Sequence, residues 1–244
     1  DTIFVNTERK NTEEQKNIRE SVRSWLNKNI LPFIEDWNQE AAFDPKLMRQ
    51  LGSIGCLGPH IPTKYGGGGL DSVTYGILMQ ELERADSGIR SCASVQSSLV
   101  MYPIWKFGSE EQREKFLPGL AKGELIGSFG LTEPNHGSNP NGMECKITKT
   151  DGGYILNGAK MWITNSPVCN LAVVWAKNEK GHIVGLIVER GMEGFSTPTI
   201  NEKWSLRASV TGELVFQDVF IPEENILKEA KGLEAALSCL TSAR

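Results

Sequence analysis

The sequence predicts an α+β protein: an N-terminal α-helical bundle followed by an antiparallel β-domain that resembles a sandwich or a barrel. Apolar residues recur at helical spacing over about the first 120 residues, and short β-rich runs separated by turn residues follow from residue 126. Helical spacing returns after Pro222. We therefore expect a helical domain over residues 1–125, a β-domain over residues 126–230, and the truncated start of a C-terminal helical domain over residues 231–244.

Capping residues and apolar spacing define the N-terminal helices. Thr12 with Gln15, and Ser109 with Gln112, each form a capping box at the start of an apolar pattern. Asp44-Pro45 suits an N-cap followed by the first position of another helix. The apolar residues of the four expected helices are Ile18, Val22, Trp25 and Leu26; Leu47, Met48 and Leu51; Val73, Ile77, Leu78 and Leu82; and Phe116, Leu117 and Leu120.

Turn residues separate the expected strands. Asp151-Gly152 lies between Lys146–Thr150 and Tyr154–Asn157, and an Asp-Gly pair between two such runs is typical of a β-hairpin. Pro222 ends the last run because proline lacks the N–H group that a sheet ladder needs. Further strands are expected at residues 171–175, 183–188 and 213–216, and the helical spacing after them covers residues 233–240.

Composition argues against several classes of partner and site. The 26 basic and 30 acidic residues give a formal charge of −4, so charge offers no support for a nucleic-acid or membrane-surface partner. No apolar run reaches the roughly 20 residues of a membrane span. The five cysteines are widely spaced and form no Cys-x-x-Cys motif, which argues against a metal site and indicates a reducing compartment. We expect a bacterial cytoplasm or a mitochondrial matrix.

Motifs of other common enzyme classes are missing from the sequence. Gly66–Gly69 lacks the Gly-Lys-Ser/Thr ending of a phosphate-binding loop and follows no strand, so we interpret it as a flexible loop. No Gly-x-Gly-x-x-Gly occurs in a β-α-β context, and no Gly-x-Ser-x-Gly elbow is present. The sequence therefore supports neither a Rossmann-type dehydrogenase nor an α/β-hydrolase.

The stretches Phe129–Ser138 and Trp162–Thr164 are the best candidates for chemistry. The first is expected to be a strand that enters a polar loop, where backbone N–H groups and hydroxyls face a ligand. The second places an indole and a hydroxyl two residues apart, on one side of an extended segment. Such a pair offers an apolar wall and one hydrogen bond to a flat heterocycle. The residues alone favour a turn and a half-buried tryptophan, and their spacing does not distinguish the two interpretations.

Together, these stretches resemble the flavin-binding signature of the acyl-CoA dehydrogenase family, and the likeness extends along the whole chain. The resemblance implies FAD as cofactor. It implies that Thr132 contacts the pyrimidine edge of the flavin, that Ser138 contacts flavin and thioester ligand, and that Trp162 and Thr164 line the isoalloxazine ring near N5. The implied cofactor-binding residues are Phe129, Gly130, Leu131, Thr132, Ser138, Trp162, Ile163 and Thr164.

Two positions depart from the pattern of the family. Asn139 stands where the family usually has aspartate after Gly-Ser, and His136 stands where a small residue is usual. We expect the loop to survive, because an asparagine side-chain oxygen is able to cap a local turn. We interpret His136 as a solvent-facing loop residue rather than a base.

A finer likeness points to one branch of the family. The segments Glu81–Ser91, Ser94–Val100 and Trp204–Ser209 resemble glutaryl-CoA dehydrogenase. The resemblance implies that Arg90 and Ser91, with Glu83 near the same pocket, bind the distal carboxylate of a glutaryl chain and that Ser138 contacts the thioester. A guanidinium suits that task because it forms a bidentate pair with a carboxylate. The alternative is a salt bridge from Arg90 to Asp86, four residues earlier on a helix.

The resemblance also implies a mechanism and partners. A carboxylate removes the α-proton of an acyl-CoA thioester while the β-hydride passes to the flavin, and in the glutaryl branch decarboxylation to crotonyl-CoA follows. Electrons leave to an electron-transferring flavoprotein, and relatives commonly form tetramers. The base belongs to the C-terminal helical domain, so we assign no general base among residues 1–244. We expect Glu133 to hold the loop turn rather than replace that base.

Two other functions stay open at this point. The protein is alternatively a dehydrogenase for a simple fatty acyl-CoA, which would not need Arg90. It is alternatively a non-catalytic acyl-CoA-binding or assembly protein on the same scaffold, an interpretation that His136, Asn139 and the unassigned base motivate.

Overall fold

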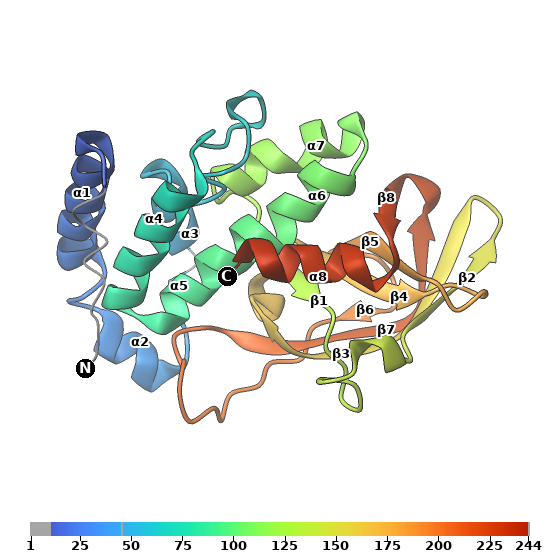
Figure 1. Cartoon of the computed structure of the whole chain (residues 1–244). Coiled ribbons are helices and arrows are strands. Elements are labelled where there is room, and N and C mark those ends of the chain that lie inside the picture. The colour runs from blue at the N-terminus through green and yellow to red at the C-terminus, as the bar shows by residue number, and fades with distance from the viewer. Residues whose placement is uncertain (1–10, 45, 244) are drawn as a thin grey trace, which may run out of the picture.

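The computed structural model describes residues 11–44 and 46–243. Helices form the first half of the described chain, strands the second, and a last helix packs against both (Figure 1). The predicted α+β class is confirmed. The α-helices are α1 (Glu13–Asn29), α2 (Ile34–Glu40), α3 (Lys46–Ser53), α4 (Ser72–Ala85), α5 (Ser87–Ser94), α6 (Tyr102–Phe107), α7 (Glu110–Ala121) and α8 (Gly232–Ala243). None of the helices described is both long enough and apolar enough to cross a bilayer.

The expected caps begin three of these helices. The Thr12 hydroxyl accepts a hydrogen bond from the Gln15 backbone N–H group, and the Thr12 N–H group donates one to the Gln15 side chain; Ser109 and Gln112 do the same for α7. At α3, the carboxylate of Asp44 accepts from the Lys46 N–H group at 2.9 Å. Pro45, the predicted first position of that helix, lies outside the described residues. The capping signals therefore located the helix starts correctly.

A π-helical segment, Val95–Met101, joins α5 directly to α6, so the chain is helical without a break from Ser87 to Phe107. π-helical turns are rare and are frequently found at functional sites. This segment packs against β1 and α8, and it therefore links the helices to the sheet.

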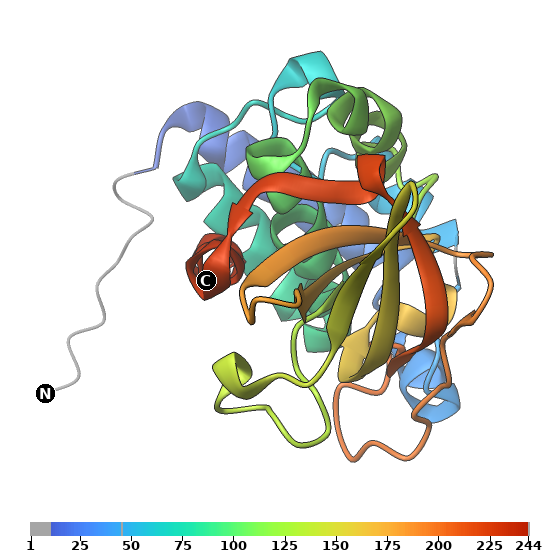
Figure 2. The ribbon, with the colours of Figure 1, turned by 90° about the vertical axis from the view of Figure 1, so that its right-hand side faces the viewer.

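The strands form a single curved sheet in the order β6-β7-β3-β2-β4-β5-β8, with β1 also paired to β4 (Figures 1 and 2). The strands are β1 (Gly127–Gly130), β2 (Lys146–Thr150), β3 (Gly153–Thr164), β4 (Leu171–Lys177), β5 (Ile183–Glu189), β6 (Phe195–Ser196), β7 (Thr211–Pro222) and β8 (Ile226–Lys231). The predicted hairpin is present as β2 and β3. The sheet differs from a purely antiparallel one because β1 and β2 both pair in parallel with β4.

Strand β4 is buried on both faces, which explains its uninterrupted apolar sequence. Val173 and Trp175 face the helices, where they share a core with Ile104 and Leu117. The alternate residues face the other side of the sheet, where Ala172, Val174 and Ala176 join residues of β3, β5 and β7. A separate apolar cluster holds α1, α3, α4 and α5 together.

The glycine run Gly66–Gly69 is tied to the preceding loop rather than free. The N–H groups of Gly68 and Gly69 donate to Gly58 O at 3.2 Å and Ile61 O at 2.9 Å. A Cβ on Gly67 would lie 2.2 Å from the Ile61 carbonyl oxygen, so the loop approaches too closely for any side chain. The segment is a loop, as predicted, but hydrogen bonds and close packing hold it, and glycine serves that packing rather than flexibility.

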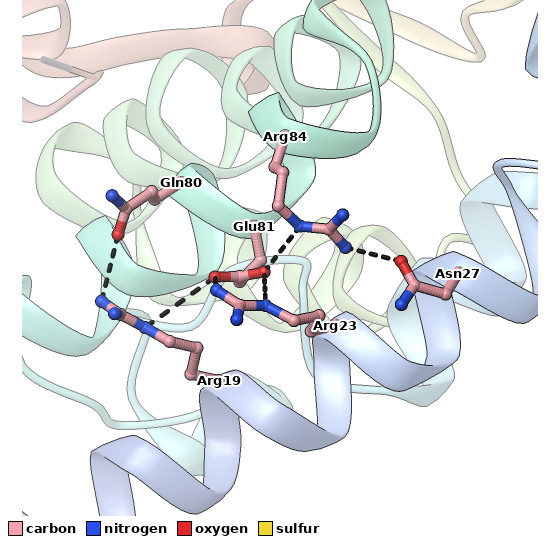
Figure 3. Close-up of polar contacts among 6 residues, drawn as sticks. All are labelled: Arg19, Arg23, Asn27, Gln80, Glu81 and Arg84. Carbon is pink, nitrogen blue, oxygen red and sulfur yellow. Dashed lines mark hydrogen bonds and ion pairs between the residues drawn. The ribbon is translucent and has the colours of Figure 1, made fainter.

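A buried carboxylate joins α1 to α4, next to the segment that carries Glu83 and Arg90. Glu81 is 1% exposed, and three guanidinium groups surround it (Figure 3). Arg23 pairs with both carboxylate oxygens at 2.7 and 2.9 Å, Arg84 approaches at 3.2 Å, and Arg19 lies 3.8 Å away. Burial raises the pKa of Glu81, but the hydrogen bonds from Arg23 and Arg84 outweigh it and hold this pKa below its usual value.

We predict that Glu81→Gln lowers the free energy of unfolding by about 3 kcal/mol near neutral pH, because it removes a buried charge among several cations. The lowered pKa means that the contribution of Glu81 is present above the ordinary carboxyl pKa and is lost as pH falls through the folded-state value. Urea unfolding from about pH 7 to about pH 3 measures both effects. Glu20→Gln, on the exposed side of α1, is the control. A deficit that persists undiminished in acid would contradict the assignment.

Candidate functional site

The loop after β1 is built on a buried ion pair. Glu133 is 4% exposed, and Lys160 on β3 has no exposed surface. Lys160 Nζ lies 2.8 Å from the Glu133 carboxylate and also donates to the Leu131 carbonyl oxygen at 3.2 Å. The N–H groups of Glu144 and Cys145 donate to the same carboxylate at 2.6 and 2.9 Å. Glu133 therefore clamps the two ends of the loop, as the turn-holding interpretation expected.

The protonation of this carboxylate follows from its partners. Burial raises the pKa of Glu133, but the hydrogen bonds from the Glu144 backbone and from Lys160 outweigh that effect, so this pKa lies below its usual value. An ionised, fully engaged carboxylate is a poor proton acceptor. The geometry thus gives Glu133 a structural role.

Most of the predicted cofactor-binding residues around this loop point away from solvent. Phe129 and Leu131 are 8% and 7% exposed, and the Phe129 ring packs edge-on against Trp175. Gly130 has no room for a side chain, because a Cβ there would lie 2.8 Å from Leu214. These three residues offer a ligand little beyond their backbone. Thr132 is half-buried, and its carbonyl oxygen accepts from the Met161 N–H group at 2.9 Å.

Trp162 and Thr164 share one hollow at the end of β3. The register between β3 and β7 shifts between Lys160 and Ile163, and Trp162 within this bulge has a φ of 62°. The bulge turns the indole outward, so that Trp162 is 57% exposed while Ile163 beside it is 3% exposed. The strand hollow, about 460 Å³, is lined by Trp162 and Thr164 together with Ser91 and the loop of residues 202–206. The predicted common side of the two residues thus depends on a bulge rather than on plain alternation.

The segment Trp204–Ser209, part of the branch likeness, forms the far wall of the strand hollow. Arg207 fixes this loop to the end of α2, donating to Asn38 O at 2.7 Å and to Gln39 O at 3.0 Å. Lys203 donates to the Leu206 and Ser209 carbonyl oxygens at 2.7 and 2.6 Å, and burial lowers its pKa. These contacts hold the loop in place around the exposed Trp204 indole.

Arg90 and Glu83 lie together in a second, larger hollow among the helices. The helix hollow, about 970 Å³, is lined by residues of α4 and α6, by Glu83 and Arg90, and by the end of α8. Arg90 Nε donates to Glu83 at 2.6 Å, and the Ser87 hydroxyl donates to the other carboxylate oxygen at 2.6 Å. The hydrogen bonds from Ser87 and Arg90 lower the pKa of Glu83, so it stays ionised beside the guanidinium.

The alternative salt bridge from Arg90 to Asp86 is not formed. Asp86 instead caps α5, where its carboxylate accepts from the Gly88 and Ile89 N–H groups at 2.7 and 3.1 Å. Because a capping carboxylate lies at the helix end, it is turned away from the side chain of Arg90. Arg90 is therefore held by a residue of the neighbouring helix.

Neighbouring residues of α5 reach different hollows. Arg90 lines the helix hollow and Ser91 lines the strand hollow, as expected for adjacent residues about 100° apart around a helix. The helix packs closely on the loop behind it, since a Cβ on Gly88 would lie 2.7 Å from the Ser209 nitrogen. The structure thus brings Arg90, Ser91, Trp162 and Thr164 to the two sides of one short helix. Ser138 is exposed on its loop and lines neither hollow.

The two departures from the family pattern have specific environments. His136 is half-buried rather than solvent-facing, with its Nε2 3.3 Å from a Glu144 carboxylate oxygen and its ring against Gly142. Asn139 is exposed and makes no side-chain cap; its backbone carbonyl accepts from the Gly142 N–H group at 3.0 Å instead. The expectation of a side-chain cap was wrong, because the short 3₁₀ turn Pro140–Gly142 satisfies the loop with backbone bonds.

Sequence reasoning did not identify His60, which lines the helix hollow, or Asn165, which is buried beside the strand hollow. His60 faces the helix hollow beside Tyr75, with the ring centroids 5.2 Å apart, and burial lowers the pKa of His60. No described residue hydrogen-bonds to its buried Nε2 atom. Asn165, directly after Thr164, is fully buried with a positive φ. A lone His or Asn in a loop carries no spacing signal, so neither residue was predictable from the pattern.

Comparisons with known proteins agree with this architecture. The model of the acyl-CoA dehydrogenase N-terminal domain matches residues 12–124, and that of the acyl-CoA dehydrogenase middle domain matches residues 128–219. A mitochondrial isovaleryl-CoA dehydrogenase of Arabidopsis thaliana is 41% identical over 93% of this chain and 57% of its own length.

Two solved structures show the same fold. A glutaryl-CoA dehydrogenase from Mycobacterium smegmatis in complex with FADH2 has a TM-score of 0.95 and 44% identity, over 98% of this chain and 61% of that one. A chain in the structure of the electron transferring flavoprotein of Acidaminococcus fermentans has a TM-score of 0.91 and 36% identity, over 96% of this chain and 63% of that one. The chain thus spans about three fifths of the length of these relatives, and it belongs to the acyl-CoA dehydrogenase family.

Proposed function

We propose that the protein carries out FAD-dependent α,β-dehydrogenation of an acyl-CoA thioester, with glutaryl-CoA as its substrate. The observation that carries this proposal is the position of α5 between the two hollows. On one side Arg90 offers a cation for a carboxylate, and on the other Ser91 faces Trp162 and Thr164. Two adjacent residues of one helix therefore reach the proposed carboxylate site and the proposed wall for a flat ring.

The residues of the strand hollow fit a flavin ring. The exposed Trp162 indole supplies an apolar surface, and Thr164 supplies a hydroxyl in the same hollow. The volume of about 460 Å³ lies within the range of small-ligand sites. We assign Trp162 and Thr164 to the ring, and the backbone of Phe129–Thr132 with Ser138 to the remainder of the cofactor. FAD supplies the acceptor for the hydride that leaves the substrate β-carbon.

The Glu83–Arg90 pair supports a dicarboxylic substrate. Glu83 accepts a hydrogen bond from Nε of Arg90. The two terminal nitrogens of the Arg90 guanidinium form no hydrogen bond with a described residue. Those nitrogens form the fork that pairs with a carboxylate in two parallel hydrogen bonds. Glu83, ionised and held by Ser87, keeps the guanidinium in one orientation and lowers the cost of ordering it when substrate binds. Ser91 completes the proposed substrate contacts.

The proposal assigns no proton-abstracting carboxylate within residues 1–244. Glu133 is committed to Lys160 and the loop backbone, and Glu83 is committed to Arg90 and Ser87. What these residues do is bind and orient: the loop clamp keeps Thr132 in place, and the ion pair keeps the guanidinium in place. Dehydrogenation is therefore proposed for the whole protein, with a base on the substrate face opposite the ring.

Partners of the whole protein belong to the same proposal. We propose an electron-transferring flavoprotein as acceptor and a homotetramer as the assembled form. Exposed apolar side chains support further protein contacts, since Trp204 is fully exposed and Leu237 on α8 is 42% exposed. Decarboxylation after oxidation, to crotonyl-CoA, is the expected outcome for a glutaryl thioester.

A dehydrogenase for a monocarboxylic acyl-CoA is the second candidate. The identity with an isovaleryl-CoA dehydrogenase favours it, because that relative acts on a chain without a distal carboxylate. In that case Arg90 and Glu83 serve only as an ion pair between α5 and α4. The two candidates therefore differ in what removal of the guanidinium does to substrate preference.

The first prediction from this proposed function concerns the protein as its gene encodes it, with any sequence beyond residues 1–244. We expect it to purify yellow with FAD and to reduce a dye acceptor on addition of glutaryl-CoA. The absorption spectrum and the rate of dye reduction measure these properties. A colourless product that takes up no added flavin would overturn the proposal and favour a non-catalytic acyl-CoA-binding role.

The second prediction concerns Arg90→Ala. We expect kcat/KM for glutaryl-CoA to fall on the order of 100-fold, because a charge-assisted pair contributes about 1.5–3 kcal/mol. The value for butyryl-CoA should stay close to that of the parent. Arg90→Lys should recover only part of the loss, since an ammonium lacks the fork.

The matched control for Arg90→Ala is Arg49→Ala. Arg49 is 64% exposed, pairs with Glu124 at 3.9 Å and lines neither hollow. Arg49→Ala should leave kcat/KM unchanged for both substrates. Equal losses of Arg90→Ala on both substrates would assign Arg90 a structural role, and no loss on either would favour the monocarboxylic candidate.

The third prediction concerns Lys160→Met. The substitution leaves the Glu133 carboxylate buried with only backbone donors, so we expect a loss of about 3–5 kcal/mol in stability. Because the loop clamp loosens with it, the Kd for FAD should rise as well. Urea unfolding and flavin fluorescence measure the two effects. Lys149→Met, which removes an exposed pair with Glu223 at 3.6 Å, should change neither, and an unchanged Lys160→Met protein would refute the clamp.

A further inference from the structure

Asn165 has an unusual backbone conformation for a fully buried residue. Its φ is 67° and its ψ is −5°, in the left-handed region, and its side chain has no exposed surface. That region costs most non-glycine residues about 1–2 kcal/mol, and asparagine tolerates it better than most. Strain of this kind persists only where the surrounding contacts hold it, so the contacts of Asn165 indicate its role.

The side-chain amide of Asn165 connects two separate elements. Its Nδ2 donates to Gly127 O at 3.2 Å and to Cys92 O at 3.4 Å. Gly127 begins β1, which leads directly into the loop of Thr132, and Cys92 follows Arg90 and Ser91 on α5. One buried amide therefore bridges the helix of the carboxylate site and the strand of the flavin loop.

The backbone of Asn165 belongs to a third element, the end of β3. Asn165 follows Thr164 directly, and its N–H group donates to the Val210 carbonyl oxygen at 2.9 Å. The neighbours of Val210 in the sequence, Ser209 and Thr211, line the strand hollow. The next turn is held by Arg190, whose Nη2 donates to the Ser166 carbonyl oxygen at 2.9 Å. The backbone at Asn165 is thus fixed on both sides.

The amide oxygen of Asn165 adds no hydrogen bond to those of its nitrogen. Among the described residues, no donor reaches the buried Oδ1 of Asn165. A buried oxygen without a partner costs about 1–3 kcal/mol, which adds to the backbone strain. Glycine at this position would avoid both costs, and what it would lose is the pair of bonds to Cys92 and Gly127.

We propose that Asn165 is a positioning residue that fixes the spacing between Arg90 and Thr164 and thereby sets the preference for a dicarboxylic acyl chain. The proposal rests on the function proposed above. In this proposal a dicarboxylic thioester passes α5 where Arg90 and Ser91 are adjacent, so that its distal carboxylate meets Arg90 while its β-carbon lies at the ring wall. A small shift of α5 against β3 then disturbs both contacts together, whereas a short monocarboxylic chain engages only the ring end.

The test compares Asn165→Gly and Asn165→Ala with the parent in the gene-encoded protein. Both variants remove the amide, and only glycine tolerates the left-handed backbone without strain. We measure the Kd of the apoprotein for FAD by fluorescence, the unfolding temperature, and the ratio of kcat/KM for glutaryl-CoA over butyryl-CoA. We expect that ratio to fall about tenfold and the Kd for FAD to rise about fivefold in Asn165→Gly, even though its strain is relieved.

Asn225→Ala is the matched control. Asn225 is also buried, at 4% exposed, and its Nδ2 donates to the Ile187 carbonyl oxygen at 2.9 Å, away from both hollows. It should lower the unfolding temperature and leave the substrate ratio and the Kd for FAD within about twofold of the parent. A control that moved the ratio as far as Asn165→Gly does would reduce the effect to general destabilisation and overturn the proposal.

The outcomes separate this inference from the function on which it rests. If the parent binds FAD and prefers glutaryl-CoA, but Asn165→Gly keeps the parent ratio, the positioning role is overturned and the function stands. If the parent binds no FAD, or shows no preference for glutaryl-CoA, the proposed function fails and the inference fails with it. A reduced ratio in both Asn165 variants, with a parent-like ratio in Asn225→Ala, supports the positioning role.

Discussion

The arrangement of the molecule depends on how Gly127, the first residue of β1, is held between helices and sheet. Two buried amides hold its peptide groups: Gln96 accepts from its N–H group at 2.8 Å, and Asn165 donates to its carbonyl oxygen at 3.2 Å. Gln96 also donates to the carbonyl oxygens of Leu120 and Leu125. A Cβ on Gly127 would lie 2.4 Å from Val100, so the strand meets the π-helical segment with no space for a side chain. Because buried peptide groups need partners, these amides fix how the two halves of the chain meet.

That junction explains why the candidate site forms from segments far apart in the sequence. β1 pairs in parallel with β4 and all four of its residues are buried, so Phe129 and Gly130 serve the core, while the loop after it reaches the surface. The Glu133–Lys160 pair then returns this loop to β3, whose bulge exposes Trp162. Trp162 and the loop after β1 therefore both lie next to buried contacts, so the side chains that face a ligand are carried by a backbone that these contacts hold in place.

The sequence predicted those features that follow from local physics. Capping residues at Thr12, Ser109 and Asp44 located helix starts, and Asp151-Gly152 located the hairpin, because caps and turns depend on neighbouring residues. The helices α2, α5 and α6 were not predicted, since their short apolar patterns gain stability only from packing. The parallel pairing of β1 with β4 was not predicted either, because the pairing of strands far apart in the sequence leaves no pattern in the residues near either strand. Trp162 and Arg90 were found through family likeness, whereas Asn165 and His60 carried no such signal.

The position of Arg90 shows why charge and helical spacing alone predicted the wrong partner, Asp86, instead of Glu83. On a helix, a carboxylate four residues earlier is the expected partner, which made Asp86 the local candidate. Asp86, however, ends α4 and caps α5, and a side chain bound to backbone N–H groups at a helix start is unavailable to the next turn. The break between the two helices places Glu83, one turn back on α4, within 2.6 Å of the guanidinium instead. The same cap that begins α5 therefore decides which carboxylate orients Arg90, and it leaves the terminal nitrogens of the guanidinium for a ligand.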